Sequence, residues 1–338
     1  MSKQKILCTL GPKSLDEKVI KDLEDLGASL FRINLSHTKL VDLDGIINFI
    51  SQCTKVPICI DTEGAQIRTT KFSFNFEENK TYELKNTIDD FSLRPFEVVA
   101  NQAKVGDLIS IDFNDVMVEV IDVSSNSIKI KTIKPGKTGE NKAVSFQKEM
   151  DIPPFSEKDY KALEIASRLG IKNYAISFAS SKDNIEELRN LVPESSYIIS
   201  KIESKKGLRN LLDIIESSNS ILIDRGDLSR EISLEKIPVF QKVIIKSTLS
   251  KKKDVYVATN LLESMIENPL PTRAEINDVF NTLLDGASGL VMAAETAIGK
   301  YPVDSVSMVN KIINFYNSII TDDNYDFNSY ETIQKFLK

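Results

Sequence analysis

Charged residues end several short apolar runs of this sequence, and their types indicate chemistry on a phosphorylated molecule. Lys201 lies in the apolar run 197–202, Glu203 follows it, and Asp227 follows the run 221–224. Two carboxylates are the number that Mg²⁺ commonly takes from a protein while water and substrate phosphate fill its other positions. A lysine beside them can neutralise a phosphoryl group or an anionic transition state. Together these residues predict metal-assisted phosphoryl transfer.

Other apolar runs also end in polar residues. These are Arg32, Asn34 and Ser36 at the run 30–35, Asp61 and Thr62 followed by Arg68 at the run 57–61, Arg225 and Gly226 before Asp227, Thr259 at the run 255–259, and Glu295 with Thr296 at the run 289–295. Because side chains alternate along a strand, Lys201 and Glu203 share one strand face. A lone charge at a strand end is commonly a solvated surface residue, whereas several that converge favour a site. The sequence has no zinc-ligand set and no glycine-rich phosphate-binding motif.

The elements that would position these residues alternate regularly. Eight apolar runs are each followed by an amphipathic helical pattern, at 5–10, 30–35, 57–61, 174–178, 197–202, 221–224, 255–259 and 289–295. After the first run, Ser14 is expected to cap a helix together with Glu17. Strand and helix in eightfold alternation predict an α/β fold of the (β/α)8 TIM-barrel type, whose active sites lie at the carboxyl ends of the strands.

Residues from about 70 to 150 interrupt this alternation. Their apolar residues recur every second position, as in Phe72, Phe74 and Phe76, which is typical of strands. We therefore expect a small all-β domain, of the β-barrel kind, inserted after the third strand. The expected boundaries are 1–70 and 151–325 for the TIM barrel, 71–150 for the insert and 326–338 for a polar surface tail.

The composition excludes some classes of partner. The chain has 43 Lys plus Arg against 49 Asp plus Glu, a net charge of -6. Nucleic acid is not expected as a partner, since phosphate backbones are bound by clustered basic residues. No apolar run has the length of a signal peptide or a transmembrane helix, so we expect a cytoplasmic protein with no membrane partner.

Motifs along the whole chain resemble those of pyruvate kinases. They are KILCTLGPKS, FRINLSH, DTEGAQIRT, PFSEKD, ISKIES, DRGDLS, ATNLLESM with PTRAE, and ETAIGKYP, in family order. The resemblance implies a TIM barrel with a lid-like insert that closes over the site. It also implies transfer of the phosphoryl group of phosphoenolpyruvate to ADP, which yields pyruvate and ATP in the last step of glycolysis.

The resemblance also implies roles for individual residues. Glu203 and Asp227 would bind Mg²⁺ or Mn²⁺, Lys201 would neutralise the phosphoryl group, and Arg32 would contact it. Gly226 and Asp227 would hold the substrate carboxylate, and Thr259 would lie beside the enolate carbon. Arg68 would contact the phosphates as a catalytic residue. The nucleotide site would consist of Pro12, His37, Arg68 and Lys142, and the K⁺ site of Asn34, Ser36, Asp61 and Thr62.

The sequence departs from the family pattern at several positions. Glu63 stands where the family has a lysine, Gln66 replaces an acidic residue associated with potassium dependence, and Ala293 replaces a serine of the proton network. The need for K⁺ is therefore open. The family normally continues into a C-terminal effector domain, whereas this sequence ends at Lys338. We expect that domain, and regulation by sugar phosphates, to be absent.

Three interpretations remain open at this point. The first is an active pyruvate kinase. The second is a phosphoenolpyruvate-binding barrel that uses another acceptor or performs a partial reaction, and the third is a catalytically silent binding or regulatory homologue. A homo-oligomer, dimer or tetramer, that associates through the barrel is expected in the first case.

Overall fold

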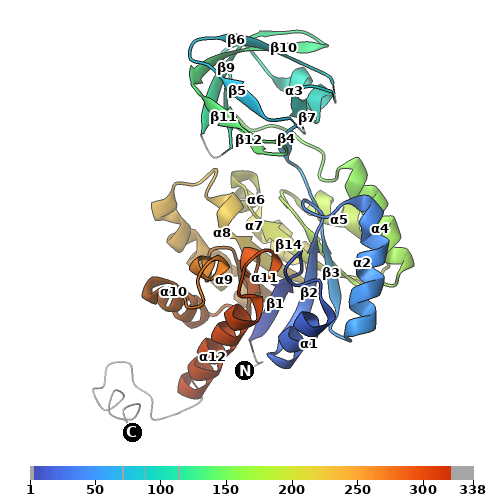
Figure 1. Ribbon diagram of the computed structural model, residues 1–338, viewed down its shortest axis with the longest axis vertical. Coiled ribbons are helices and arrows are strands. Elements are labelled where there is room, and N and C mark those ends of the chain that lie inside the picture. The colour runs from blue at the N-terminus through green and yellow to red at the C-terminus, as the bar shows by residue number, and fades with distance from the viewer. Residues whose placement is uncertain (1–3, 71, 88, 113–114, 321–338) are drawn as a thin grey trace. The chain divides into compact units, whose positions relative to one another are not determined.

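The computed structural model describes residues 4–70, 72–87, 89–112 and 115–320 (Figure 1). The chain divides into two compact units. The first unit comprises Met1–Glu63 with Glu157–Lys338, and the second comprises Gly64–Ser156. The expected tail, 326–338, lies outside the described residues.

The first unit contains a closed barrel of eight parallel strands. In barrel order these are β1 (Lys5–Thr9), β17 (Gly289–Met292), β16 (Asp254–Ala258), β15 (Ser220–Asp224), β14 (Tyr197–Ile202), β13 (Asn173–Ile176), β3 (Ile58–Asp61) and β2 (Ala28–Asn34). Strands that are adjacent in the barrel are also consecutive barrel strands along the chain, as is typical of short connections. The predicted TIM barrel is confirmed.

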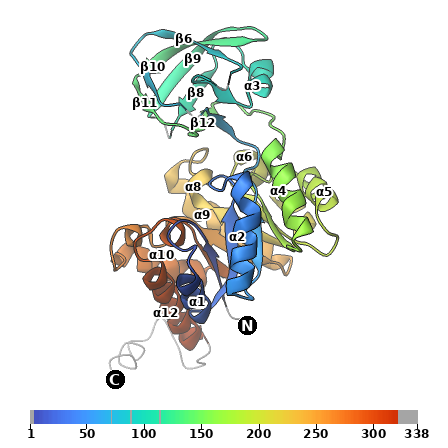
Figure 2. The same cartoon turned by 45° about the vertical axis from the view of Figure 1, so that its right-hand side comes forward.

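Helices cover the outside of this barrel, as Figures 1 and 2 show. They are α1 (Glu17–Asp25), α2 (Leu40–Cys53), α4 (Glu157–Arg168), α5 (Lys182–Leu191), α6 (Lys205–Arg209), α7 (Leu211–Ser217), α9 (Ile237–Ser250), α10 (Arg273–Leu284) and α12 (Pro302–Ile320). Two short helices, α8 (Arg225–Leu228) and α11 (Ala294–Ala297), directly follow strands β15 and β17. Two 3₁₀ turns, Leu234–Lys236 and Glu263–Ile266, complete the unit.

Two local expectations in this unit are wrong. Helix α1 is capped by Asp16, whose Oδ1 accepts from the N–H groups of Lys18 and Val19 at 3.0 and 3.1 Å. Ser14 instead accepts from the Gly11 N–H at 3.0 Å, because it closes the turn after β1. The run 289–295 leaves the strand after Met292, so Glu295 and Thr296 belong to helix α11.

The interior of the barrel is filled by one inward-facing layer of apolar side chains. It consists of Leu7, Cys59, Ala175, Ile199, Leu222, Tyr256, Ala258 and Val291, with Leu30 packed against them. Since the strand period is two, the residue two positions further along each strand faces the same way. On six strands that residue is polar: Thr9, Arg32, Asp61, Ser177, Lys201 and Asp224. The apolar layer is thus the floor beneath a polar site at the carboxyl ends of the strands.

The second unit is built on antiparallel strands. Its seven-stranded sheet has the order β6 (Thr81–Lys85), β10 (Ser127–Lys134), β9 (Val116–Val123), β8 (Leu108–Ile111), β12 (Ala143–Phe146), β4 (Ile67–Thr69) and β7 (Leu93–Arg94), and β11 (Gly136–Thr138) pairs with β5 (Phe74–Phe76). An aromatic cluster fills part of its core, in which the rings of Phe74 and Phe91 stack with centroids 4.9 Å apart. The predicted strands are present, together with one helix that the period-two pattern did not indicate, α3 (Phe96–Gln102).

The second unit begins earlier than residue 71. Strand β4 pairs with β12 and β7 of the second sheet, with Arg68 opposite both Ala143 and Arg94. These ladder hydrogen bonds assign the segment from Gly64 to this unit.

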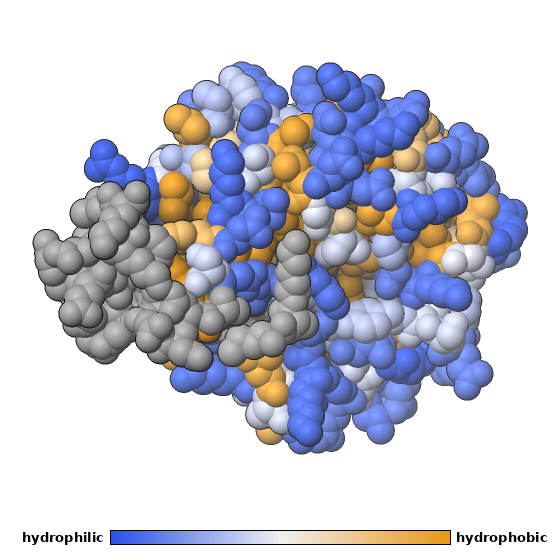
Figure 3. Space-filling model, turned by 90° about the horizontal axis from the view of Figure 1, so that it is seen from below, coloured by the Kyte–Doolittle hydropathy of each residue, from blue (hydrophilic) through white to orange (hydrophobic). Residues whose placement is uncertain are grey.

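The surface seen in Figure 3 is mainly polar, with apolar residues interspersed. Apolar side chains scattered over a surface are normal for folded proteins. None of the described helices combines the length and the apolar character that a membrane span needs.

Candidate active site

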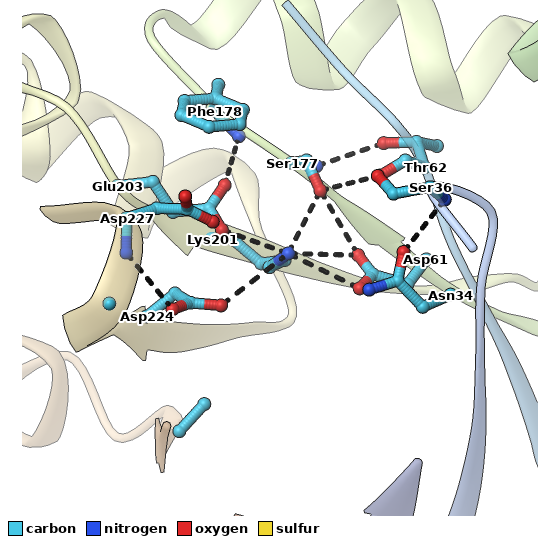
Figure 4. Close-up of polar contacts among 12 residues, drawn as sticks. Asn34, Ser36, Asp61, Thr62, Ser177, Phe178, Lys201, Glu203, Asp224 and Asp227 are labelled. Carbon is cyan, nitrogen blue, oxygen red and sulfur yellow. Dashed lines mark hydrogen bonds and ion pairs between the residues drawn. The ribbon is translucent and has the colours of Figure 1, made fainter. Parts of the chain in front are cut away.

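Lys201 is the centre of a buried polar cluster at the carboxyl end of the barrel (Figure 4). Its Nζ lies 2.9 Å from Oε1 of Glu203, 3.3 Å from both carboxylate oxygens of Asp61 and 3.9 Å from Oδ2 of Asp224. It also donates to Oγ of Ser177 at 3.0 Å. Four strand ends therefore meet at one ammonium group.

The carboxylate of Asp61 links Lys201 to a second cation. Nη1 of Arg32 lies 3.0 Å from Oδ2 of Asp61, and Nε of Arg32 donates to Oγ1 of Thr9 at 2.9 Å. Both side chains are almost completely buried. Nη1 of Arg32 makes this ion pair but no hydrogen bond to a described residue, and it is buried. The ion pair and the Nε hydrogen bond together hold Arg32 in place.

The surroundings keep Lys201 charged. Burial by itself lowers the pKa of its ammonium group, but the attraction of Asp61, Glu203 and Asp224 outweighs burial. The net pKa shift is upward. Lys201 is therefore a fixed positive charge and not a proton donor at neutral pH.

Three carboxylates converge beside Lys201. Glu203, Asp224 and Asp227 each offer an oxygen, and these oxygens lie within 4.8 Å of one another. Oε2 of Glu203 accepts from the main-chain N–H of Phe178 at 2.6 Å. Oε1 is buried and accepts no hydrogen bond from the described residues, since its contact with Lys201 is an ion pair without hydrogen-bond alignment.

This carboxylate group fits a divalent cation. Burial raises the pKa of Glu203 most strongly, Lys201 opposes that rise, and Asp224, Asp227 and Asp61 add to it. A buried carboxylate with a raised pKa is costly to ionise unless a cation joins it. Oxygen ligands of this kind are those that Mg²⁺ and Mn²⁺ take.

Thr259 lies beside these carboxylates, directly after β16. Its Oγ1 accepts from the Gly226 N–H at 2.8 Å and lies 3.2 Å from Oδ1 of Asp224. The side chain of Asp227 pairs with Arg230, Nη1 to Oδ1, at 2.9 Å. Helix α8 thus presents Gly226 and Asp227 at the edge of the cluster.

Comparisons with known proteins identify the family of this chain. Residues 1–306 match the family model for the pyruvate kinase barrel domain. The chain belongs to the pyruvate kinase family. Among its relatives are pyruvate kinases of Thermotoga maritima, 33% identical over 92% of this chain and 70% of that protein, and of Thermoplasma acidophilum, 33% identical over 96% of this chain and 60% of that protein. A third, from Aeropyrum pernix, is 33% identical over 91% of this chain and 69% of its own length. This chain thus spans about 60% to 70% of the length of these three relatives.

Most of the site residues expected from the pyruvate kinase motifs lie in the barrel unit. Lys201, Glu203 and Asp227 lie together as described above. Asn34 and Asp61 are register partners of β2 and β3, and Asn34 Oδ1 accepts from the Ser36 N–H at 2.9 Å. Thr62 Oγ1 accepts from the Ser177 N–H at 3.0 Å.

Two expected nucleotide residues of the pyruvate kinase pattern also lie in the barrel unit. Pro12 is exposed just after β1, and His37 is exposed just after β2, where its main-chain N–H donates to the Asn34 carbonyl at 3.1 Å. Both follow the carboxyl ends of their strands, which is the end of a TIM barrel that carries active sites.

The other two, Arg68 and Lys142, belong to the second unit. Arg68 donates to Oε1 of Gln66 at 2.6 Å and to the Asn141 carbonyl at 2.9 Å. Nζ of Lys142 lies 2.9 Å from Oδ2 of Asp112. Gln66, at a family acidic position, therefore serves here as a neutral partner for Arg68.

The sequence interpretation missed several residues of this buried cluster. Ser177 and Asp224 both contact Lys201, and Phe178 supplies a main-chain donor to Glu203. Each of the first two follows an inward-facing apolar residue by two positions, a signal that can be read only once the inward-facing residues are known. Glu295, in contrast, accepts from the main-chain N–H groups of Leu262 and Ala293, so its carboxylate holds loops together.

Proposed function

We propose that this chain transfers the phosphoryl group of phosphoenolpyruvate to ADP and yields pyruvate and ATP. The observation that carries the proposal is the juxtaposition of Lys201 with three carboxylates at the carboxyl end of the barrel. Phosphoryl transfer requires cations around the phosphoryl oxygens far more than it requires a covalent intermediate. A charged lysine beside a divalent-cation site is that arrangement.

Glu203 and Asp227 would hold Mg²⁺ or Mn²⁺, and Asp224 adjoins them. A bound divalent cation supplies charge neutralisation for phosphate and carboxylate oxygens. Around it, Lys201 and Arg32 neutralise the phosphoryl group from the barrel side. Their ion pairs with Asp61 hold both cations in place, so little reorganisation is needed when the substrate binds.

The N–H groups of Gly226 and Asp227 would receive the substrate carboxylate. In the structure they donate to Thr259 Oγ1 at 2.8 Å and to Asp224 Oδ1 at 3.5 Å. These side-chain oxygens accept from the two N–H groups, as the oxygens of a substrate carboxylate would. Thr259 would then lie next to the enolate carbon and assist its protonation, without the serine that the family carries at the position of Ala293.

In the barrel unit, Pro12 and His37 would bind ADP. In the second unit, Arg68 and Lys142 would be phosphate-binding residues. Arg68 lies on β4, and Lys142 immediately precedes the paired strand β12, where its main-chain N–H donates to Thr69 Oγ1 at 2.8 Å; this proximity supports a shared role. Arginine and lysine are the usual partners of phosphate groups.

A monovalent cation would be bound by Asn34, Ser36, Asp61 and Thr62. All four carry oxygens and lie at the ends of the neighbouring strands β2 and β3. Gln66 in place of an acidic residue leaves the need for K⁺ open, so activity with and without K⁺ is the test of this assignment.

The decisive experiment measures pyruvate formation from phosphoenolpyruvate and ADP with Mg²⁺, in the presence and absence of K⁺. The control is the Lys201→Met variant, which removes the central charge. We expect turnover in the unaltered protein and its loss in the variant. No turnover with ADP or any other nucleoside diphosphate would overturn the proposal.

We further infer a cytoplasmic homo-oligomer that associates through the barrel, with no nucleic-acid partner. The acidic net charge of -6 supports the last point. Sedimentation velocity at several protein concentrations tests the oligomeric state, and a monomer at all concentrations would contradict it.

A further inference from the structure

Thr259 adopts a backbone conformation that its residue type disfavours. Its φ is 68°, and that of Asn260 is 53°. Asparagine tolerates the left-handed region, whereas a β-branched residue there is a clear outlier. Such strain persists only where the surroundings over-determine it, and it is frequent at functional sites. The question is which group holds Thr259 there.

Arg225 forms hydrogen bonds to the main chain of this turn. Its Nε and Nη2 donate to the Thr259 carbonyl at 3.1 and 2.6 Å, and Nη2 also donates to the Asn260 carbonyl at 3.1 Å. The remaining Nη1 pairs with Oδ2 of Asp278 from α10 at 2.7 Å. One planar guanidinium group thus bonds to the carbonyls of both left-handed residues, and an ion pair to helix α10 holds the guanidinium in place.

The side chain of Thr259 is held from the same strand end. Oγ1 bonds to the Gly226 N–H and lies within reach of Asp224, and these residues flank Arg225. The hydroxyl also donates to the Ala258 carbonyl of its own strand at 2.6 Å, so the end of β15 fixes the Thr259 carbonyl and contributes to fixing its hydroxyl. No other described contact fixes the carbonyls of Thr259 and Asn260 in this way.

Arg225 is adjacent to the proposed substrate-binding residues but is not arranged as a substrate ligand. Each of its three guanidinium nitrogens is engaged with a main-chain carbonyl or with Asp278. Arg32 and Lys201, in contrast, meet only side chains of the buried cluster. Of these three cationic side chains, only Arg225 forms hydrogen bonds to the main chain of the turn at Thr259.

We propose that Arg225 is a positioning residue that holds Thr259 in its left-handed conformation, so that the hydroxyl is aimed at the enolate carbon. The inference rests on the proposed function and deepens it. It predicts that the guanidinium acts on the protonation step through Thr259, and not on the binding of metal or phosphate.

The test compares Arg225→Lys with Asp278→Asn. A lysine keeps the charge but cannot span two carbonyls and a carboxylate at once. We expect R225K to lower kcat for pyruvate formation by about 10-fold to 100-fold, the cost of a misplaced group, with the phosphoenolpyruvate KM and Mn²⁺ affinity within about twofold. D278N, which keeps an oxygen acceptor, should show a smaller loss in the same direction.

A second readout isolates Thr259 from phosphoryl transfer. Exchange of the pyruvate methyl hydrogens with solvent deuterium, followed by proton NMR, depends on proton transfer at the enolate carbon and not on ADP. It should slow in R225K in parallel with kcat. The matched control is Arg189→Lys, since Arg189 also donates to a main-chain carbonyl, that of Ser217 at 2.9 Å, on the other side of β15 in sequence. We expect R189K to leave exchange unchanged.

Unaltered kcat and exchange in R225K would overturn the inference, as would a raised phosphoenolpyruvate KM with unchanged kcat, which would make Arg225 a substrate ligand. If R225K does not fold, D278N decides by the same criteria. Failure of the proposed function is distinguishable, because the unaltered protein would then form no pyruvate while exchange still reports on Arg225. Absence of both reactions in the unaltered protein would overturn both.

Discussion

The main-chain N–H of Phe178 donates to Oε2 of Glu203 at 2.6 Å, and Phe178 holds a φ of 52° in that position. A bulky residue in the left-handed region is strained, so the hydrogen bond is maintained at a cost to the backbone. Its effect is to fix the orientation of Glu203. One oxygen is occupied by a neutral donor, and the other is directed toward Lys201 and the two aspartates.

Removal of the Glu203 charge should weaken divalent-cation binding. Glu203→Gln keeps an oxygen that can accept from Phe178 but loses the negative charge. We expect the Mn²⁺ affinity of the protein without substrate to fall by at least about tenfold, since a ligand contributes more than the outer partners worth 10-fold to 100-fold. Electron paramagnetic resonance of free Mn²⁺ measures this. Glu216→Gln is the control, because Glu216 is exposed and pairs only at the surface with Lys251. Equal affinities in both variants would contradict the assignment.

Divalent-cation binding should weaken as the pH falls. Burial raises the pKa of Glu203, with opposition from Lys201 and support from Asp224 and Asp227. A cation must displace the proton that a raised pKa retains, so affinity depends on pH. As the pH is lowered, we expect Mn²⁺ affinity to begin to fall before the pH reaches about 4.3, the ordinary pKa of glutamate. Isothermal titration across this range, with heats of buffer ionisation subtracted, should also show proton release. A flat affinity down to pH 5 would refute it.

Loss of Lys201 should destabilise the fold as well as the reaction. In Lys201→Met, Asp61, Glu203 and Asp224 lose their shared cation while they stay buried. Breaking a buried ion pair by removal of one partner costs about 3–5 kcal/mol. We expect a loss of this order in urea unfolding with a chelator present.

Added Mg²⁺ should stabilise the Lys201→Met variant more than the unaltered protein, since the cation restores positive charge to the cluster. An unchanged urea midpoint in the chelated variant would show that the three carboxylates are protonated or solvated. The exposed Lys251, which pairs with Glu216, offers a matched control as Lys251→Met.

Much of the barrel and of the central site could be predicted from sequence because each depends on local periodicity. Strand period two was enough to place Lys201 and Glu203 on one face of their strand, and Arg32 and Asn34 on one face of theirs. Ser177 and Asp224 needed the inward-facing layer as a reference, since only knowledge of which residues fill the barrel assigns their faces.

The remaining differences have local physical causes. Ser14 and Asp16 are both good helix caps, and the turn at Gly11 that decides between them is a tertiary feature. The start of α11 was missed although its alanines favour a helix, because the apolar run of β17 continues into them without a polar break. The left-handed turns at Phe178 and Thr259 have no signal in residue type, because the surroundings impose them.

The last prediction concerns the histidine of the FRINLSH motif. His37 is exposed after β2, and the cluster around Lys201 accounts for the chemistry without it. We expect His37→Ala to raise the Kd for ADP by about tenfold, the worth of one modest hydrogen bond to a charged ligand, with kcat at saturating ADP within about twofold. His37→Gln, which keeps a donor, should lose less affinity. Equilibrium binding of ADP and steady-state kinetics measure the two quantities. A collapse of kcat with unchanged ADP affinity would instead place His37 in the chemistry.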